Sequence, residues 1–166
     1  MYFLPTLLFV LAIGVSGREQ FAAVKGKLMC GAKPAENVVI RLYDRDVDPD
    51  PDDLLDFALT DITGEFDLKG STSEAVDIEP VLRIYTDCND SRIKMALGLR
   101  KISFILPYQY VTNPGVTTKY FDIGTINLES RFPGEEREQL SDKHRRHHYR
   151  YNRLTYDNDF DMFDGL

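Results

Sequence analysis

The sequence predicts an all-β protein: a two-sheet β-sandwich of seven or eight strands, followed by a disordered C-terminal tail. Three observations lead to this prediction. From Phe21 to Leu128 the apolar residues mostly alternate with polar ones, which places them on one face of successive strands. Turn-forming residues separate these runs at short intervals. No helical period persists over three turns in this span, so helix is limited to short connections.

The strands follow from the phase of their apolar residues. In the first strand the lysines at positions 25 and 27 fall on the face opposite to the apolar side chains. Strand by strand, the residues expected to point inward are Ala22, Val24, Leu28 and Cys30; Val38, Ile40 and Leu42; Leu55, Phe57 and Leu59; Phe66 and Leu68; Leu82, Ile84 and Cys88; Ile102, Phe104 and Leu106; and Phe121, Ile123, Ile126 and Leu128.

Two local signals predict a turn between strands and an irregularity within a strand. The segment Thr60–Gly64 reads as a hairpin turn, with Gly64 free to adopt a positive φ. In the last strand, Phe121 and Ile123 share one phase and the following apolar residues share the other. This change of phase at Gly124-Thr125 predicts a β-bulge.

Residues 1–17 predict an export signal. They carry no charge, their apolar run is shorter than the roughly 20 residues that span a bilayer, and the small residues Val15-Ser16-Gly17 suit a signal peptidase. A buried N-terminal helix is the alternative interpretation. Since no later stretch is long and apolar enough to act as an anchor, we expect a secreted, extracellular protein with no transmembrane segment.

The chain contains two cysteines, Cys30 and Cys88, each in phase with the inward residues of its own strand. In an exported protein, this placement predicts one disulfide bond, with two buried free thiols as the alternative. Closing a loop of that length stabilises a fold by about 4 kcal/mol in the chain-entropy model. A single disulfide is too little to replace a core, so apolar packing must do most of the folding.

The character of the chain changes after Pro133-Gly134. Strand alternation stops, a basic block occupies 143–153, and an acidic block with aromatic residues occupies 156–164. Such a composition does not bury enough apolar surface to order itself, apart from a short helix over Glu135 to Leu140. The expected organisation is a signal peptide (1–17), one β-sandwich domain (18–134) and a charged, disordered tail (135–166).

Composition argues against nucleic-acid binding and against catalysis. The formal charge is −7, from 20 basic and 27 acidic side chains, whereas phosphate binding needs a basic face. The three histidines, His144, His147 and His148, all lie in the tail, so the sandwich has no imidazole to act as a base. The disulfide leaves no cysteine nucleophile. We therefore expect no enzyme activity, no catalytic residues and no cofactor.

Two modification sites are candidates. Asn89-Asp90-Ser91 is an N-glycosylation sequon directly after a cysteine, with an unmodified turn as the alternative. Lys143, Arg145 and Arg146 resemble a dibasic processing site, and cleavage after Arg146 would release 147–166. The alternative is a basic patch that attracts acidic surfaces or folds back on the acidic end of the tail.

Two charged clusters are candidate binding surfaces. Seven aspartates crowd 44–56, and clustered carboxylates suit calcium. However, Pro49 and Pro51 stiffen the segment and the EF-hand glycine and glutamate are missing, so a solvated loop that protects an edge strand is the simpler interpretation. A basic cluster that would suit anionic headgroups, an acidic protein face or merely solvent comprises Arg92, Lys94, Arg100 and Lys101.

Several segments, taken in order, resemble the nematode transthyretin-like family of secreted β-sandwich proteins. The resemblance covers about Val24 to Leu128, nearly the whole predicted core, and rests on Val24-Lys25-Gly26-Lys27-Leu28-Met29-Cys30, Pro34 to Asp44, Asp50-Pro51-Asp52-Asp53-Leu54-Leu55, Thr60-Asp61-Ile62-Thr63-Gly64-Glu65-Phe66-Asp67-Leu68-Lys69-Gly70, Glu79-Pro80-Val81-Leu82-Arg83-Ile84-Tyr85 with Cys88, and Phe121-Asp122-Ile123-Gly124-Thr125-Ile126-Asn127-Leu128.

The resemblance implies a transthyretin-like (prealbumin-like) sandwich in an extracellular protein, and for most members no defined biochemical activity. One member is described as a bridge between phosphatidylserine exposed on dying cells and a phagocyte receptor. The related hydroxyisourate hydrolases use sandwich histidines and a C-terminal Tyr-Arg-Gly-Ser, and this sequence has neither. The long tail also departs from the usual short family C-terminus.

The function that we expect is therefore that of a binding or adaptor protein whose partner is an extracellular protein or a cell-surface component. Two alternatives stay open: a carrier of a small apolar ligand bound between subunits, and a precursor whose tail is released by processing. The sequence does not decide the oligomeric state.

Overall fold

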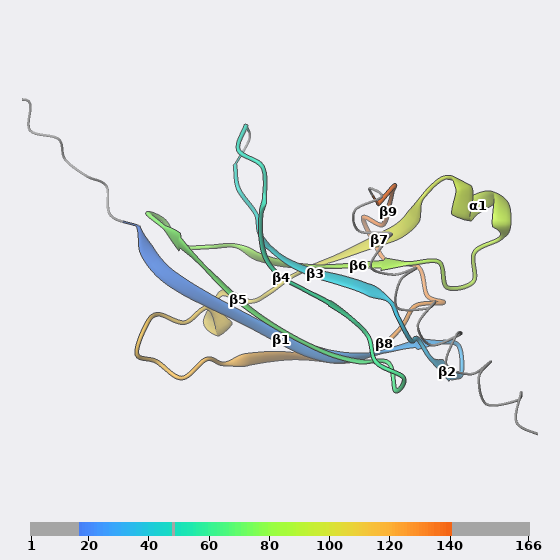
Figure 1. Cartoon of the computed structure of the whole chain (residues 1–166), viewed down its shortest axis with the longest axis horizontal. Helices are drawn as coiled ribbons and strands as arrows, with labels where there is room; N and C mark the ends of the chain where they lie inside the picture. Colours follow the sequence, from blue (N-terminus) through green and yellow to red (C-terminus); the bar gives the residue numbers. More distant parts are fainter. Residues whose placement is uncertain (1–16, 48, 141–166) are drawn as a thin grey trace, which may run out of the picture.

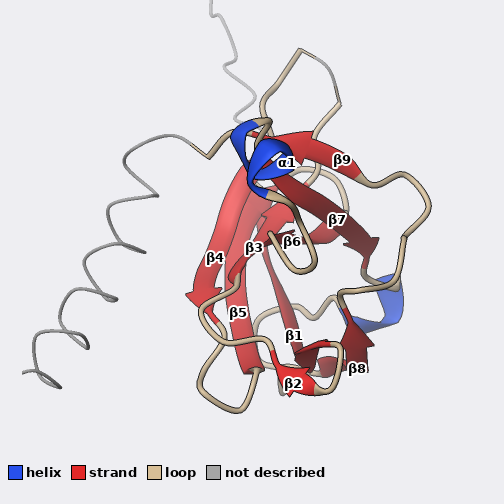
Figure 2. Ribbon diagram, turned by 90° about the vertical axis from the view of Figure 1, so that its right-hand side faces the viewer, coloured by secondary structure: helices blue, strands red, loops and turns tan. Residues whose placement is uncertain are grey.

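The computed structural model describes residues 17–47 and 49–140, in which two β-sheets pack face to face (Figures 1 and 2). Nearly all of the regular structure is strand, as the apolar alternation predicts. The elements are β1 (Arg18–Cys30), β2 (Lys33–Pro34), β3 (Val39–Asp44), β4 (Asp53–Leu59), β5 (Glu65–Glu74), β6 (Pro80–Thr86), α1 (Arg92–Ala96), β7 (Leu99–Ile105), the 3-10 turn η1 (Tyr108–Tyr110), β8 (Tyr120–Asn127) and β9 (Glu136–Glu138).

One sheet has four strands and the other has five. In the four-stranded sheet β1 is central: it pairs antiparallel with β2 and β5, and parallel with β8 on its other side. The five-stranded sheet has the order β4-β3-β6-β7-β9, and all of its pairings are antiparallel. This arrangement confirms the predicted all-β, two-sheet sandwich.

The core lies between the two inner faces, and it contains most of the alternating residues that the sequence singles out. The prediction was wrong for Phe57 and Leu59, which pack with Val39 and Tyr85 in a separate cluster, because the register of β4 shifts against β3 and Ala58 takes the inward position. Inward-pointing side chains alternate along the strands, which is how the two sheets form one apolar layer, and β3 and β6 are buried on their outer face as well. Side chains with almost no exposed surface include Val24, Leu28, Ile40, Leu42, Leu68, Leu82, Ile84, Ile102 and Leu128.

The two predicted local features are both present. Gly64 has a φ of 77°, and a Cβ there would lie 2.2 Å from the carbonyl oxygen of Leu28, so only glycine fits this turn. Along β8, Asp122 is the register partner of Lys25 but Thr125 is the partner of Lys27. β8 therefore carries one extra residue at the predicted β-bulge.

The ordered structure continues past the boundary expected at Gly134. Instead of the short helix predicted over Glu135 to Leu140, β9 pairs with the edge of β7, and the Leu140 side chain is buried (Figure 2). Charged residues order here because Lys101 and the buried Arg100 supply their counter-ions.

Several predictions fall outside the described residues. They concern residues 1–16 of the export signal, the processing site at Lys143, Arg145 and Arg146, and the three histidines of the tail. None of the helices within residues 17–47 and 49–140 is long and apolar enough to span a bilayer.

Candidate binding site at the disulfide end of the sandwich

A disulfide bond joins the two sheets at one end of the sandwich. Cys30 is the last residue of β1, and Cys88 lies two residues beyond β6. Their Cα atoms are 5.8 Å apart, within the normal range for a disulfide, and the bond closes a sequence separation of 58 residues. The pair expected from the sequence is thus the pair that forms.

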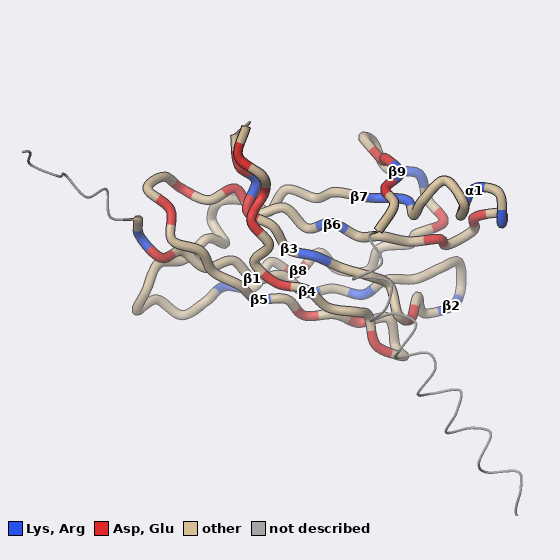
Figure 3. The backbone as a smooth tube through the Cα atoms, turned by 45° about the horizontal axis from the view of Figure 1, so that its top comes forward, with Lys and Arg blue, Asp and Glu red and all other residues tan. Residues whose placement is uncertain are grey.

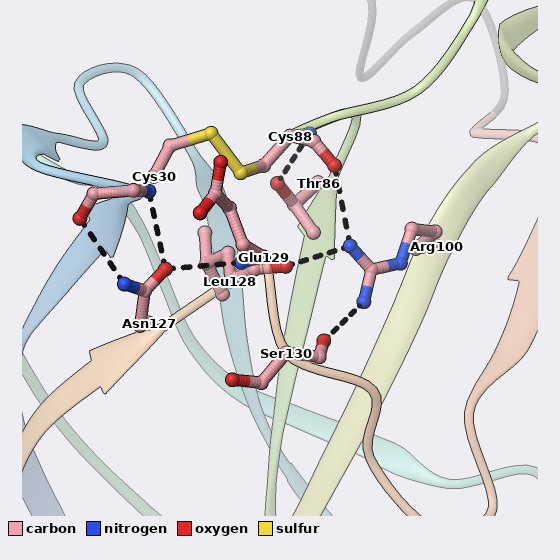
Figure 4. Close-up of a disulfide and its surroundings, with 9 residues drawn as sticks. Cys30, Thr86, Cys88, Arg100, Asn127, Leu128, Glu129 and Ser130 are labelled. Carbon is pink, nitrogen blue, oxygen red and sulfur yellow. Dashed lines mark hydrogen bonds between the residues drawn. A yellow bond between two sulfur atoms is a disulfide. The ribbon is translucent and has the colours of Figure 1, made fainter.

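Arg100 of β7 organises the chain around this disulfide (Figure 4). Its Nη1 donates hydrogen bonds to the carbonyl oxygens of Cys88 at 3.2 Å and Leu128 at 2.7 Å, and its Nη2 donates to that of Ser130 at 2.8 Å. Nε and Nη2 also bind the two carboxylate oxygens of Glu135, each at 2.7 Å. A buried guanidinium with every nitrogen bonded rigidifies its surroundings.

The same contacts fix the protonation state of Glu135. Its side chain is only 11% exposed, and the hydrogen bonds from Arg100 outweigh the effect of burial, so that the pKa of this carboxyl is lowered to about 2. Glu135 therefore stays ionised at neutral pH. The connection between β8 and β9 is held against the disulfide end by this ion pair.

Asn127 fastens a second strand end to the same region. Its Oδ1 accepts hydrogen bonds from the backbone N–H groups of Gly31 and Glu129, and its Nδ2 donates to the Gly31 carbonyl oxygen, all at 3.1 Å. The turn after β1 is thereby bonded to the end of β8, next to the disulfide (Figure 4).

The connection between β6 and β7, which contains α1, begins next to the disulfide and its hydrogen-bonded surroundings. Arg137 of β9 binds both carboxylate oxygens of Asp90, at 2.8 and 2.9 Å, and donates from Nη1 to the carbonyl oxygens of Lys94 and Gly98. The hydrogen bonds from Arg137 lower the pKa of Asp90. The Ser91 Oγ accepts a hydrogen bond from the Lys94 N–H and caps the helix. Both ends of the connection are therefore held.

Apolar side chains project from this connection into solvent. Ile93 is 80% exposed, Leu97 is 63% exposed, and Met95 is also exposed, while Arg92 and Lys94 alternate with them. α1 has no buried residue and lies at one extreme of the molecule (Figure 1). We call Arg92, Ile93, Lys94, Met95 and Leu97 the α1 tip. Single exposed apolar residues are common, but three within five positions on a protruding element are typical of an interaction site.

The structure divides the basic cluster that the sequence grouped together. Arg92 and Lys94 are exposed on the α1 tip, whereas Arg100 points into the molecule and Lys101 forms ion pairs with Glu136 and Glu138 at 2.8 and 3.1 Å. Adjacent strand residues point to opposite faces, so these four residues do not form one patch.

The connection between β3 and β4 is rich in acidic residues (Figure 3). Several of its carboxylates bind groups within the same chain. Asp44 is buried and accepts a hydrogen bond from the Glu79 N–H, while burial raises its pKa. Asp52 binds Arg83 and the N–H of Asp46. Among the described residues no group of three or more acidic, histidine or cysteine side chains is placed to hold a metal ion.

Asn89 lies in the turn that follows the disulfide. Its side chain is exposed and its φ is 60°, and the turn is closed by a hydrogen bond from the Asp90 N–H to the Asp87 carbonyl oxygen. The sequon asparagine is therefore accessible at the surface, just before the α1 tip in the sequence.

An open depression of about 730 Å³ lies elsewhere, beside β1 and β8. Much of its lining is charged, including Lys25, Lys27, Asp67 and Asp122. Lys25 and Lys27 form ion pairs with neighbouring carboxylates on the same face, at 3.7 and 3.8 Å. This chemistry does not suit a small apolar ligand.

Known proteins match this sequence over most of its length. The family model described as "TTR-52: Transthyretin-like family" matches residues 25–107. The chain belongs to the transthyretin-like family. Transthyretin-like protein 46 of Caenorhabditis elegans is 46% identical over 156 residues, which cover 91% of this chain and 86% of that protein. Transthyretin-like protein 33 of the same nematode is 41% identical over 138 residues, covering 82% and 94%.

Among solved structures, a 9R-lipoxygenase from Cyanothece is similar with a TM-score of 0.35 and 20% identity, covering 75% of this chain and 18% of that one. A likeness this distant carries no argument about this chain.

The sequence indicated Cys30 and Cys88 but gave no sign of the residues that brace the site. Arg100, Glu135 and Arg137 form ion pairs across sequence separations of 35 and 47 residues. Local patterns do not encode such pairs. The nearest signal in the sequence was the alternation of basic and apolar residues over 92–97.

Proposed function

We propose that this transthyretin-like protein is a secreted, extracellular binding or adaptor protein without catalytic activity, and that the α1 tip is its contact surface. The observation that carries the proposal is the exposure of Ile93, Met95 and Leu97 on a connection that is fixed at both ends. An apolar surface that is already held in one conformation loses little entropy when it binds. The disulfide bond supports an oxidising, extracellular environment.

The chemistry of the tip indicates the kind of partner. Apolar side chains alternate with Arg92 and Lys94, so the complementary surface has an apolar centre with acidic or anionic groups around it. The described part of the chain contains no histidine, since all three lie beyond Leu140. This distribution supports a binding role rather than acid–base catalysis.

Capture of partners tests the role of the tip. The full-length chain is secreted from cultured eukaryotic cells as wild type, as I93S/L97S, and as I62S, a control at a turn isoleucine that is 76% exposed. Each form is immobilised and exposed to extracellular fluid and to intact cells of the source organism. Because each large apolar side chain contributes about 1.5–3 kcal/mol when buried, I93S/L97S is expected to lose at least tenfold in capture while I62S keeps it. Equal capture by all three forms contradicts the proposal.

Asn89 is proposed to carry an N-glycan when the chain passes through the secretory pathway. Its exposed position in the turn supports this proposal, because the glycosylating enzyme needs an accessible sequon. Intact-mass measurement of the secreted wild type and of N89Q, before and after enzymatic deglycosylation, checks it. A wild-type mass that equals that of the bare polypeptide contradicts it.

A further inference from the structure

The outer face of the five-stranded sheet contains a buried arginine, Arg41. It lies in the middle of β3, in register with Arg83 of β6 and Phe57 of β4, and it is only 5% exposed. Its Nη1 donates a hydrogen bond to the Tyr43 hydroxyl at 3.2 Å. Its Nε and Nη2 are buried and have no hydrogen-bond partner among the described residues. Two donors of this guanidinium therefore need an acceptor.

A second buried donor lies beside Arg41, on the neighbouring strand β6. The guanidinium carbon is 5.1 Å from the centre of the Tyr85 ring, and the Tyr85 hydroxyl is buried without a hydrogen-bond partner in the described part of the chain. Burial raises the pKa of this phenol to about 12, so the hydroxyl keeps its proton at neutral pH. Two adjacent strands thus contribute N–H and O–H groups to one buried region.

The carboxylates near these donors are bound by other cations. Asp52 binds Arg83, and Glu136 and Glu138 both bind Lys101. Within the described residues the charge of the buried guanidinium is therefore not balanced by an acid of its own, which is strongly unfavourable. A water molecule would accept hydrogen bonds here but would leave the charge, whereas an anion satisfies the donors and neutralises the charge together.

The packing around the donors limits the size of that anion. Leu140 packs with Val39 and Tyr85 over the outer face, and the β3–β4 connection is fastened to β6 by the ion pair between Asp52 and Arg83. The unpartnered nitrogen and oxygen atoms have almost no surface open to solvent. An organic acid would have to displace these packed side chains, whereas an ion of a single atom needs the least space. Apolar neighbours also favour an anion that sheds its hydration readily.

We infer that Arg41 and Tyr85 bind one chloride ion at the outer face of the five-stranded sheet, through Nε and Nη2 of the guanidinium and the hydroxyl of the phenol. The ion serves as the counter-ion of Arg41, as Glu135 does for Arg100 at the inner face. It stabilises the fold, because the unfolded chain does not hold these donors together and so does not bind the ion. Bromide, a halide of similar size and the same charge, binds at the same place.

Unfolding of the full secreted chain by urea tests the site, with chloride exchanged for the much larger gluconate anion at constant ionic strength. For a dissociation constant of about 0.1 M, about 0.5 M chloride should lower the wild-type unfolding equilibrium constant roughly sixfold relative to gluconate. Bromide should act as chloride does. R41M should lose this response, whereas R45M, a control at an exposed arginine that is paired with Glu79, should keep it. No chloride response in wild type, or the same response in R41M, overturns the inference.

Y85F provides an independent measurement that does not depend on how well R41M folds. It removes only the hydroxyl, and loss of a buried hydroxyl that had no acceptor would be neutral or stabilising. If the hydroxyl binds chloride, Y85F should instead weaken the affinity for chloride, read from the same titration, at least threefold. An unchanged chloride response in Y85F contradicts the assignment. I93S/L97S should keep the full response, because the α1 tip takes no part in the site, which separates this inference from the proposed function.

Discussion

The two faces of the five-stranded sheet each bury an arginine, and the two arginines differ in how fully they are bonded. At the inner face, by the disulfide, Arg100 donates five hydrogen bonds, two of them to Glu135. At the outer face, Arg41 donates one hydrogen bond within the described residues. The difference shows that a charged residue beyond β8 completes the inner face, because Glu135 supplies the counter-ion of Arg100.

The largest effect is expected when the fully bonded arginine is removed. R100M leaves the largely buried Glu135 without its main counter-ion and three carbonyl oxygens without this donor, and it should lower the free energy of unfolding by about 5 kcal/mol. Urea unfolding of the secreted protein measures this, with R83M as a control at a more exposed arginine. A loss in R100M no larger than that in R83M would show that the bonding of Arg100 does not matter for stability.

Removal of the disulfide should have the next largest effect. C30A/C88A frees a loop of 58 residues in the unfolded state and is expected to lower the free energy of unfolding by about 4 kcal/mol. The measurement is urea unfolding of the double variant beside the oxidised wild type. If the wild type unfolds identically with and without reductant, the disulfide contributes nothing and the prediction fails.

Low pH should weaken the ion pair between Arg100 and Glu135. The pKa of Glu135 is lowered from 4.5 to about 2, so its stabilising contribution is complete above about pH 4.5 and is lost as the pH falls toward 2. A fall of that size corresponds to about 3 kcal/mol. The pKa of Asp90 is also lowered, so the stabilising contribution of its ionised carboxylate is likewise lost as the pH falls. Unfolding free energies measured between pH 6 and 2 should therefore fall less steeply in E135Q than in wild type, and parallel profiles would contradict this origin.

The smallest effect on stability is expected at the α1 tip. Ile93 and Leu97 contact mainly solvent, so I93S/L97S should change the free energy of unfolding by less than about 0.5 kcal/mol. Thermal unfolding of this variant beside wild type measures it. A large loss would mean that the two side chains serve the fold, and would remove the reason to regard them as a contact surface.

The core of the sandwich could be predicted from local patterns because burial repeats with a period of two. The alternation of Val24, Leu28, Ile40 and Leu42 placed each of these side chains on its inner face, and the phase change at Gly124-Thr125 located the bulge. The long-range ion pairs that hold the candidate site in place could not be predicted. The binding of Arg137 to Asp90, and the order of β9, depend on long-range ion pairs between residues that look like solvated surface in the sequence.

The predicted basic cluster also shows the limit of predicting a site from local sequence. Proximity in sequence grouped Arg100 with Lys101, but adjacent residues of a strand point to opposite faces, and Arg100 points inward, where it binds Glu135. What remains at the surface is a smaller and more apolar feature, the α1 tip. Exposure, which the sequence does not reveal, is what makes it a candidate.

Site-specific photo-cross-linking tests the central claim most directly. A photoreactive phenylalanine analogue replaces Ile93 in one form of the full-length chain and Ile62 in another, and each secreted protein is irradiated in extracellular fluid and on intact cells of the source organism. Our account predicts a discrete cross-linked species from position 93 and none from position 62. Cross-linking from position 62 alone would place the contact surface elsewhere and contradict the account.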